Sequence, residues 1–245
     1  MSALALVVVL LLGWEALVRL GGVDELLLPA PTSIARSLWE DAGLLAPDLA
    51  VTAGEAVLGL LAAIAAGIAI ALAMHLWAPV RAALHPLVVG SQAVPVIVIA
   101  PALLLLLGFG LAPKVVIVAL VCFFPVTINL FDGLRAASAD QRRMLRSLHA
   151  TRWQALRHLE APAALPQAFT GLKVAAAVSV IGAVFAEWSG SSQGLGHLLL
   201  TAGGQLEPAR VFAATVLLFA LAIALYAAFA IAERRLVTWN DPGGP

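Results

Sequence analysis

The chain has 245 residues, of which 62% are hydrophobic and only 11% are charged, whereas soluble domains are about 25% charged. So much apolar surface excludes a soluble fold of this size. The balance of 14 basic and 14 acidic residues disfavours a nucleic-acid partner, which would need a basic surface. The single cysteine, Cys122, excludes an internal disulfide. The composition therefore predicts an integral membrane protein.

Six apolar runs are long enough to cross a bilayer, whose roughly 30 Å hydrocarbon core needs about 20 helical residues. In chain order they cover residues 3–20, 55–76, 86–107, 113–131, 167–185 and 208–231. The alternation expected of β-barrel strands is absent, and only helices or closed barrels satisfy the backbone in lipid. The sequence therefore predicts an all-α polytopic membrane protein in which residues 1–245 form a single transmembrane domain of six helices.

The first apolar run has two interpretations. A cleavable signal peptide would need a basic n-region and a small-residue cleavage site. No Lys or Arg precedes Arg19, and Trp14-Glu15 is a poor end for such a segment. We therefore expect a retained first helix.

The distribution of positive charge predicts the orientation. With the N-terminus in the cytoplasm, the inside loops carry nine basic residues and the outside loops carry four. The inside set is Arg81, Arg135, Arg142, Arg143, Arg146, Arg152, Arg157, Arg234 and Arg235, and the outside set is Arg19, Arg36, Lys114 and Arg210. This excess predicts that both termini of this membrane protein are cytoplasmic.

The longest external stretch, 21–54, contains one further helix signal. Pro31-Thr32-Ser33 is typical of a helix start with Thr32 or Ser33 as the N-cap. Ile34, Leu38 and Leu45 then favour a short amphipathic helix at the outer interface. Glu15 and Glu55 are expected near helix ends, where they can reach water, and we expect no buried charge elsewhere.

The longest internal stretch, 132–166, is helical in character and carries six arginines. Its apolar residues follow a helical spacing that breaks near His149-Ala150-Thr151. Thr151 is the expected cap of the second helix, and Pro162 and Pro166 are expected to end it and start the next span. Composition alone leaves open a docking surface for a cytoplasmic partner or a connector that lies on anionic headgroups.

This internal stretch resembles the coupling loop of ABC importer permeases. That family has Glu-Ala-Ala, three residues, Gly, nine residues and then Ile-x-Leu-Pro. Here the same spacing places Arg143-Met144-Leu145 at the first motif, His149 at the Gly, Leu159 at the Ile and Ala161-Pro162 at the Leu-Pro. A Gly at that position would permit a turn with positive φ, in which His is less comfortable.

The resemblance covers nearly the whole chain and is closest to the nitrate, sulfonate, taurine and bicarbonate branch. Two stretches, Gly171-Leu172-Lys173-Val174-Ala175 and 187–196, are similar to permeases for thiamine-precursor pyrimidines and for riboflavin. The cargo expected from this similarity is a small polar organic molecule, with a lean to a thiamine-precursor pyrimidine. Sulfonate, taurine, nitrate and riboflavin are the alternatives.

The resemblance implies a type I ABC importer permease fold and a homodimer of this subunit in membrane lipid. It also implies two cytoplasmic ATPase subunits and an extracytoplasmic substrate-binding protein. The chain has no G-x-x-x-x-G-K-[ST] motif, so ATP hydrolysis is expected in a partner and no cofactor or catalytic residue is expected here. The residues expected to contact the ATPase are Arg146, Ser147, Leu148, His149, Ala150, Thr151, Arg152 and Trp153.

Polar residues and prolines inside the spans are candidates for the transport pathway, because they are costly unless they face a cavity or a neighbouring helix. The candidates are Ser91, Gln92, Pro95, Asn129 and Ser179. The alternative role for each is hydrogen bonding between helices. No His, Cys or acidic residues stand at metal-ligand spacing.

The sequence is also compared with two other functional classes, a membrane enzyme and a secondary transporter or channel. Gly190-Ser191-Ser192-Gln193-Gly194 matches the G-x-S-x-G nucleophile pattern, with His197 five residues after Ser192. That pattern needs a preceding strand and an acidic residue between Ser and His, so a simple turn is favoured over a membrane enzyme. A secondary transporter or channel would predict charges near the bilayer centre.

Overall fold

The computed structural model describes residues 3–239, and every regular element in that range is a helix. The elements are α1 (Ala3–Leu20), α2 (Pro31–Glu40), α3 (Ala42–Leu76), α4 (Ala78–Gly90), η1 (Ser91–Ala93), α5 (Val96–Leu107), α6 (Leu111–Arg135), α7 (Ala139–Ser147), α8 (Arg152–Ala155), η2 (Leu156–Glu160), α9 (Ala161–Trp188), α10 (Leu195–Gly204) and α11 (Pro208–Leu236). The prediction of an all-α fold is confirmed.

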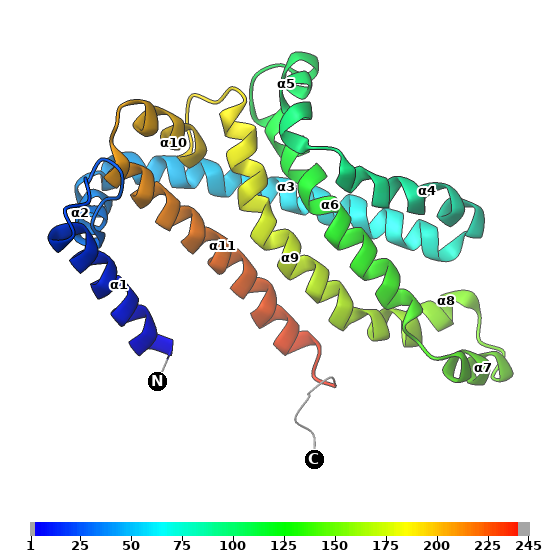
Figure 1. Cartoon of the computed structure of the whole chain (residues 1–245). Coiled ribbons are helices and arrows are strands. Elements are labelled where there is room, and N and C mark those ends of the chain that lie inside the picture. The colour runs from blue at the N-terminus through cyan, green and yellow to red at the C-terminus, as the bar shows by residue number, and fades with distance from the viewer. Residues whose placement is uncertain (1–2, 240–245) are drawn as a thin grey trace.

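The centre of the molecule is the packing of α6 against α9 and α3 (Figure 1). Val118, Cys122 and Ala175 are fully buried there, and small residues allow the helices to approach closely. A Cβ built on Gly59 would lie 2.3 Å from the Cβ of Val118, so the α3–α6 contact requires glycine. In contrast, α1 packs against α2, and its Trp14 ring lies 6.0 Å from that of Phe212 in α11.

Four of the described helical segments are long and apolar enough to cross a membrane: α3, α6, the run from Arg152 to Trp188, and α11. A fifth crossing arises if α4–η1 and α5 are counted as one span, although the two parts are bent by 103°. The segment expected to span the membrane over 86–107 is therefore bent in the structure, and its crossing stays a prediction. The bend lies at Val94-Pro95, where proline lacks the N–H that would continue a helix. A multi-pass architecture follows, and the count of six stays a prediction.

Helix α3 begins much earlier than the expected second span. It runs for 35 residues from Ala42, which is about 52 Å and exceeds the bilayer core. Hydropathy marked only residues 55–76, because Asp48 and Thr52 make the first turns polar. Much of the expected external stretch is thus an extension of a membrane helix.

The structure also differs from the expected helix boundaries at two places, near Pro162 and at the start of α2. Pro162 and Pro166 do not interrupt the helix, because a π-helical turn lies directly before Ala161. In this turn the Ala161 N–H donates to the carbonyl of Leu156, five residues back. The N-cap of α2 is Ala30, with Pro31 in the first turn and no side-chain cap. Thr32 instead binds the Glu15 carboxylate of α1 through its N–H and its hydroxyl.

Candidate functional site

The internal stretch folds into α7, a tight turn and α8, at the opposite end of the molecule from α2 and α10 (Figure 1). Ser138 starts α7 with a capping box, because its hydroxyl accepts from the Gln141 N–H while the Gln141 side chain accepts from the Ser138 N–H. Thr151 starts α8 with the same arrangement through Gln154. The prediction that Thr151 caps the second helix is confirmed.

The turn between these helices places His149 in the left-handed region, with φ 54°. The His149 N–H donates to the carbonyl of Arg146 and the Ala150 N–H donates to that of Leu145. These two bonds make a Schellman motif, in which glycine normally occupies the left-handed position. The chain therefore keeps the backbone turn that the family's glycine permits, but builds it with a histidine.

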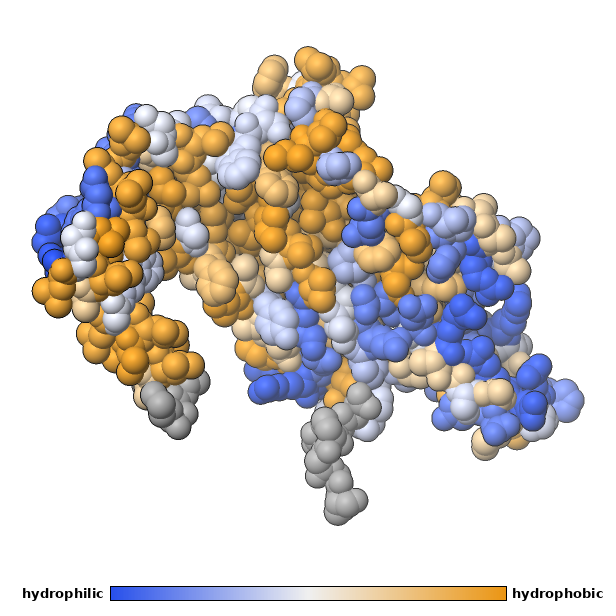
Figure 2. Space-filling model, in the orientation of Figure 1, coloured by the Kyte–Doolittle hydropathy of each residue, from blue (hydrophilic) through white to orange (hydrophobic). Residues whose placement is uncertain are grey.

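The surface of this segment combines apolar and basic side chains. Leu148 and Trp153 are 66% and 67% exposed, and Figure 2 shows hydrophilic residues gathered around α7 and α8. Exposed aromatic and aliphatic side chains beside arginines are typical of a protein interface.

A continuous helix joins this surface to the other end of the molecule. The run from Arg152 to Trp188 has 37 residues, which is about 55 Å. A movement applied at Trp153 can therefore be transmitted across the membrane by one rigid element.

The candidate pathway residues do not form one hydrogen-bonded group. Ser91 donates to the carbonyl of Val88 within α4, and Gln92 and Pro95 are exposed at the bend. The Asn129 side chain donates to a carbonyl of its own helix α6, and the buried Ser179 does so in α9. Among these five candidates, Gln92 alone has a polar side chain without a hydrogen bond in the described part of the chain.

The end of the molecule opposite α7 and α8, which we call the outer end, contains a carboxylate site that was not expected from the sequence. Glu187, only 1% exposed, accepts from the Thr52 hydroxyl at 2.6 Å and from the backbone N–H groups of Gly196 and His197. These two N–H groups belong to the first turn of α10, where helices leave donors unpaired. Glu187 thus caps α10 with its carboxyl group, which accepts from the N–H groups that the first turn leaves unpaired.

The backbone of the preceding loop is shaped around this carboxylate. Gly194 has φ 108°, and a Cβ there would lie 2.3 Å from the Glu187 carboxyl carbon. The Gly194 N–H donates to the Asp48 carboxylate at 2.8 Å. The nucleophile-like motif is therefore a capping loop, and its Ser192 and His197 share no hydrogen bond in the described part of the chain.

A buried ion pair lies beside this loop. Lys114 Nζ is 2.6 Å from Glu55 Oε1 and 2.7 Å from the Ser191 hydroxyl. Glu55 is 2% exposed and Lys114 is 8% exposed. The expectation that Glu55 reaches water and that no charge is buried is therefore wrong, because Glu55 lies in the interior of α3 and Lys114 of α6 packs against it.

One signal in the sequence could have indicated this pair. Charges within apolar runs are costly unless they are partnered, and Glu55 and Lys114 each stand at the start of a predicted span. The pairing itself has no local signature, since 59 residues separate the two.

Comparisons with known proteins agree with this geometry. The family of binding-protein-dependent transport system inner membrane components matches residues 57–238. The formylaminopyrimidine transport permease ThiX of Halalkalibacterium halodurans is 34% identical over 93% of this chain and 91% of its own length. The riboflavin transport system permease RibX of Chloroflexus aurantiacus is 33% identical over 94% and 87%, respectively.

Among solved structures, an inward-facing form of the MetNI methionine ABC transporter superposes with a TM-score of 0.70 at 18% identity, covering 80% of this chain and 97% of that one. This likeness shows the ABC importer permease fold. The chain belongs to the family of binding-protein-dependent transport system inner membrane components, and it is the permease subunit of an ABC importer.

Proposed function

We propose that residues 146–153 are the surface through which cytoplasmic ATPase subunits drive this permease. The observation that carries this proposal is the exposure of Leu148 and Trp153 at the start of the helix that runs to Trp188. Closure of the ATPases on ATP binding would displace α7 and α8. The long helix would then rock with them, shifting the subunit between inward and outward states.

Two substitutions test this coupling surface. Leu148→Arg and Trp153→Ala should abolish ATP-driven uptake while membrane insertion and subunit folding are retained. Trp239→Ala is the matched control, because Trp239 is 56% exposed near the end of the described chain. Normal uptake by both coupling variants in reconstituted vesicles would contradict the proposal. Uptake by the permease alone would instead favour a secondary transporter or channel.

The functional unit that we propose is a homodimer embedded in lipid. Helix α5 supports it, because its Val98, Leu105 and Leu106 are 69–83% exposed although the helix packs against α6 and α9. Burying this face against a second copy would place Ser91, Gln92 and Pro95 near the dimer interface and make the bend part of the pathway. Asn129 and Ser179 are the weaker pathway candidates, since each binds its own helix.

A substitution at the bend tests the pathway. Gln92→Leu should raise the KM for cargo with ATPase binding unchanged, and Asn129→Leu should affect it less. Equal KM values for wild type and Gln92→Leu would remove Gln92 from the pathway.

The orientation that we propose places α7 and α8 and both termini in the cytoplasm. It is supported by the structure at the two ends: the first turn of α1 and the last turn of α11 lie on the same side as α7 (Figure 1), although the terminal residues themselves are outside the described range. Cysteine labelling of Ser147→Cys from the inside and of Ser33→Cys from the outside checks this assignment.

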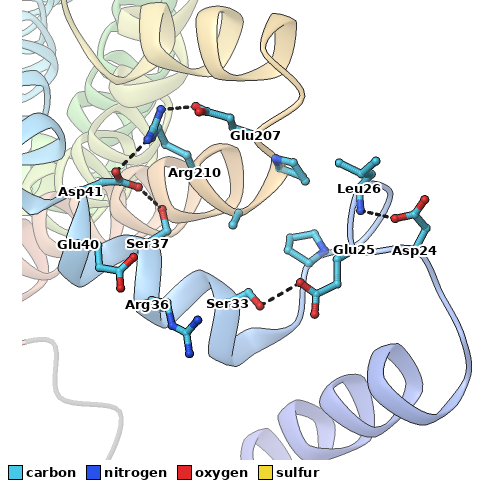
Figure 3. Close-up of a pocket in the computed structure, with 13 residues that line it drawn as sticks. Asp24, Glu25, Leu26, Ser33, Arg36, Ser37, Glu40, Asp41, Glu207 and Arg210 are labelled. Carbon is cyan, nitrogen blue, oxygen red and sulfur yellow. Dashed lines mark hydrogen bonds and ion pairs between the residues drawn. The ribbon is translucent and has the colours of Figure 1, made fainter.

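The opposite end then offers a surface to the extracytoplasmic binding protein. A cleft of about 460 Å³ lies between α2 and the start of α11 (Figure 3). Its charged lining is Asp24, Glu25, Arg36, Glu40, Asp41, Glu207 and Arg210. Figure 3 shows Arg210 held by Asp41 and Glu207, while no dashed line joins Glu40 to another residue. The excess of acidic groups favours a basic patch on the partner.

The cargo that we propose is a small polar organic molecule, with a thiamine-precursor pyrimidine as the first candidate. Its support is the identity to ThiX, and the nearly equal identity to RibX keeps riboflavin as an alternative, beside sulfonate, taurine and nitrate. Uptake of radiolabelled formylaminopyrimidine by the assembled transporter should be saturable, and formylaminopyrimidine should outcompete riboflavin for transport. Transport of taurine or riboflavin alone would reassign the cargo.

A further inference from the structure

We call α7, the turn at His149 and α8 the coupling segment. A cavity of about 300 Å³ lies at its base, where the end of α3 meets α4, α6, α7 and α8. Four helices each contribute one arginine to its wall. They are Arg81 of α4, Arg135 of α6, Arg142 of α7 and Arg152 of α8, joined by His75 and Glu160. These arginines are separated by up to 71 residues in the sequence and are brought together only by the fold.

The cavity has one carboxylate for four guanidinium groups, and that carboxylate is already engaged. Glu160 Oε2 is 2.7 Å from His75 Nε2, and Glu160 Oε1 is 3.6 Å from Arg142 Nε. Glu160 is the only acidic residue in the lining, so at least three of the four guanidinium groups have no acidic partner there. Arg135 and Arg152 are exposed and Arg81 and Arg142 are half-buried, so this surplus of positive charge lines a cavity that is open to solvent and attracts an anion.

The contacts of the arginines leave their charges available. The Arg142 Nη2 donates to the backbone carbonyl of Arg135 at 3.0 Å, while its Nε is buried without a hydrogen-bond partner. The Arg135 guanidinium lies 5.4 Å from the Phe131 ring centroid. In the described part of the chain, the side chains of Arg81 and Arg152 make no ion pair.

We propose that this cavity binds a phosphate group. Guanidinium groups match phosphate oxygens with paired N–H donors, and several of them around one cavity suit an anion with three free oxygens. The phosphate can come from the headgroup of an anionic phospholipid or from free phosphate in the cytoplasm. The lipid source fits the position, because the neighbouring Trp77 is 56% exposed at the break between α3 and α4, as interfacial tryptophans are.

Occupancy of the cavity joins the coupling segment to the rest of the subunit. A phosphate held by Arg81, Arg135 and Arg152 would connect α4, α6 and α8, and thereby stiffen the base on which Leu148 and Trp153 are presented. The site goes beyond the transport function, since it needs neither cargo nor ATP to bind its ligand.

The experiment compares binding by the purified full-length permease and three double variants. Arg81→Gln/Arg135→Gln removes two charges from the cavity without touching the proposed ATPase contacts. Arg81→Lys/Arg135→Lys keeps the charges and loses the paired donors. The matched control is Arg234→Gln/Arg235→Gln, which removes two charges at the end of α11, outside the cavity.

Two probes distinguish the sources of the phosphate. Inorganic phosphate is titrated into detergent-solubilised protein, and native mass spectrometry counts lipids retained from nanodiscs of phosphatidylglycerol or phosphatidylcholine. The Gln variant should bind about 30-fold more weakly, at roughly 1 kcal/mol per basic residue, and the Lys variant should retain most of the affinity. Binding of phosphatidylglycerol without inorganic phosphate assigns a lipid site, and the reverse assigns a free anion.

Equal binding by the Gln variant and the control in both arms overturns the proposal. Unchanged phosphate and lipid binding combined with weaker ATPase association would instead assign the arginines to an acidic surface of the protein partner. Because binding is read without transport, failure here is distinguishable from failure of the coupling surface.

Discussion

The two ends of this subunit are built in different ways. At the end that carries α7 and α8, each of these helices starts with a capping box whose partners lie three residues apart, as at Ser138 and Thr151. At the outer end, the capping loop is held by long-range bonds from buried carboxylates: Glu187 is bound by Thr52, which lies 135 residues away. The coupling segment is exposed, whereas the side chains of Thr52, Glu55, Lys114 and Glu187, which form the outer cluster, are buried.

This difference indicates which end can move independently. A locally folded segment keeps its shape when it is displaced as a unit, so it suits an element that follows a partner. The outer cluster ties α3, α6, α9 and α10 together through desolvated groups, so its bonds must break or move together. We therefore expect substitutions at the outer cluster to affect stability, and substitutions in the coupling segment to affect transport.

The largest effect is expected at the buried ion pair. Lys114→Met leaves the Glu55 carboxylate buried without its partner, which should cost about 3–5 kcal/mol of stability. Thermal unfolding in detergent measures the loss. The double variant Glu55→Gln/Lys114→Met should recover most of it, because it removes both charges of this pair together. A Lys114→Met protein as stable as wild type would show that this ion pair does not stabilise the outer end.

Loss of the α10 cap should come next. Glu187→Ala leaves the Gly196 and His197 N–H groups and the Thr52 hydroxyl without their acceptor, at an expected cost of about 2–4 kcal/mol. Glu187→Gln keeps an acceptor oxygen and should lose less. Hydrogen exchange of α10 checks this locally, with the exposed Glu25→Ala as control. Unchanged protection of α10 in Glu187→Ala would show that the loop is held by other contacts.

A smaller effect on stability is expected at His149, the left-handed residue of the coupling turn. His149→Gly removes backbone strain but loosens the unfolded chain, so stability should change by no more than about 1 kcal/mol and ATP-driven uptake should persist. His149→Val places a β-branched residue at φ 54° and should destabilise the turn. Limited proteolysis between α7 and α8 measures both effects. Faster cleavage of the Gly variant than of the Val variant would contradict this reasoning.

The smallest effect is expected at the exposed edge of the outer end. The hydrogen bond from Arg210, supported by one from Ser37, holds the pKa of Asp41 below its usual value despite partial burial. A lowered folded pKa stabilises the protein at pH values above the unfolded pKa of about 4. This contribution is lost as the pH falls through the folded pKa.

Asp41→Asn should therefore cost no more than about 1 kcal/mol at pH 7, as is usual for such pairs. The difference from wild type should shrink below pH 4, which thermal unfolding across a pH series measures. Asp24→Asn, at an acid without an ion pair among the described residues, is the control. A difference that persists unchanged at pH 3 would assign the effect to packing.

The sequence by itself determined the membrane class, the apolar centres of α3, α6, α9 and α11, and the coupling turn with its Thr151 cap. These features depend on hydropathy and on partners a few residues apart, both of which are visible along the chain. The left-handed turn at His149 was not predicted, because the family's spacing places a glycine there and histidine is less comfortable at positive φ.

Only the tertiary structure decided the rest. The bend at Val94-Pro95, the extension of α3 to Ala42 and the burial of Glu55, Lys114 and Glu187 depend on which helices lie side by side. The same holds for the four arginines around one cavity, since hydropathy reports how apolar a segment is but not what faces it. A charge near the end of an apolar run can reach water or meet a buried partner, and the packing of distant helices determines which.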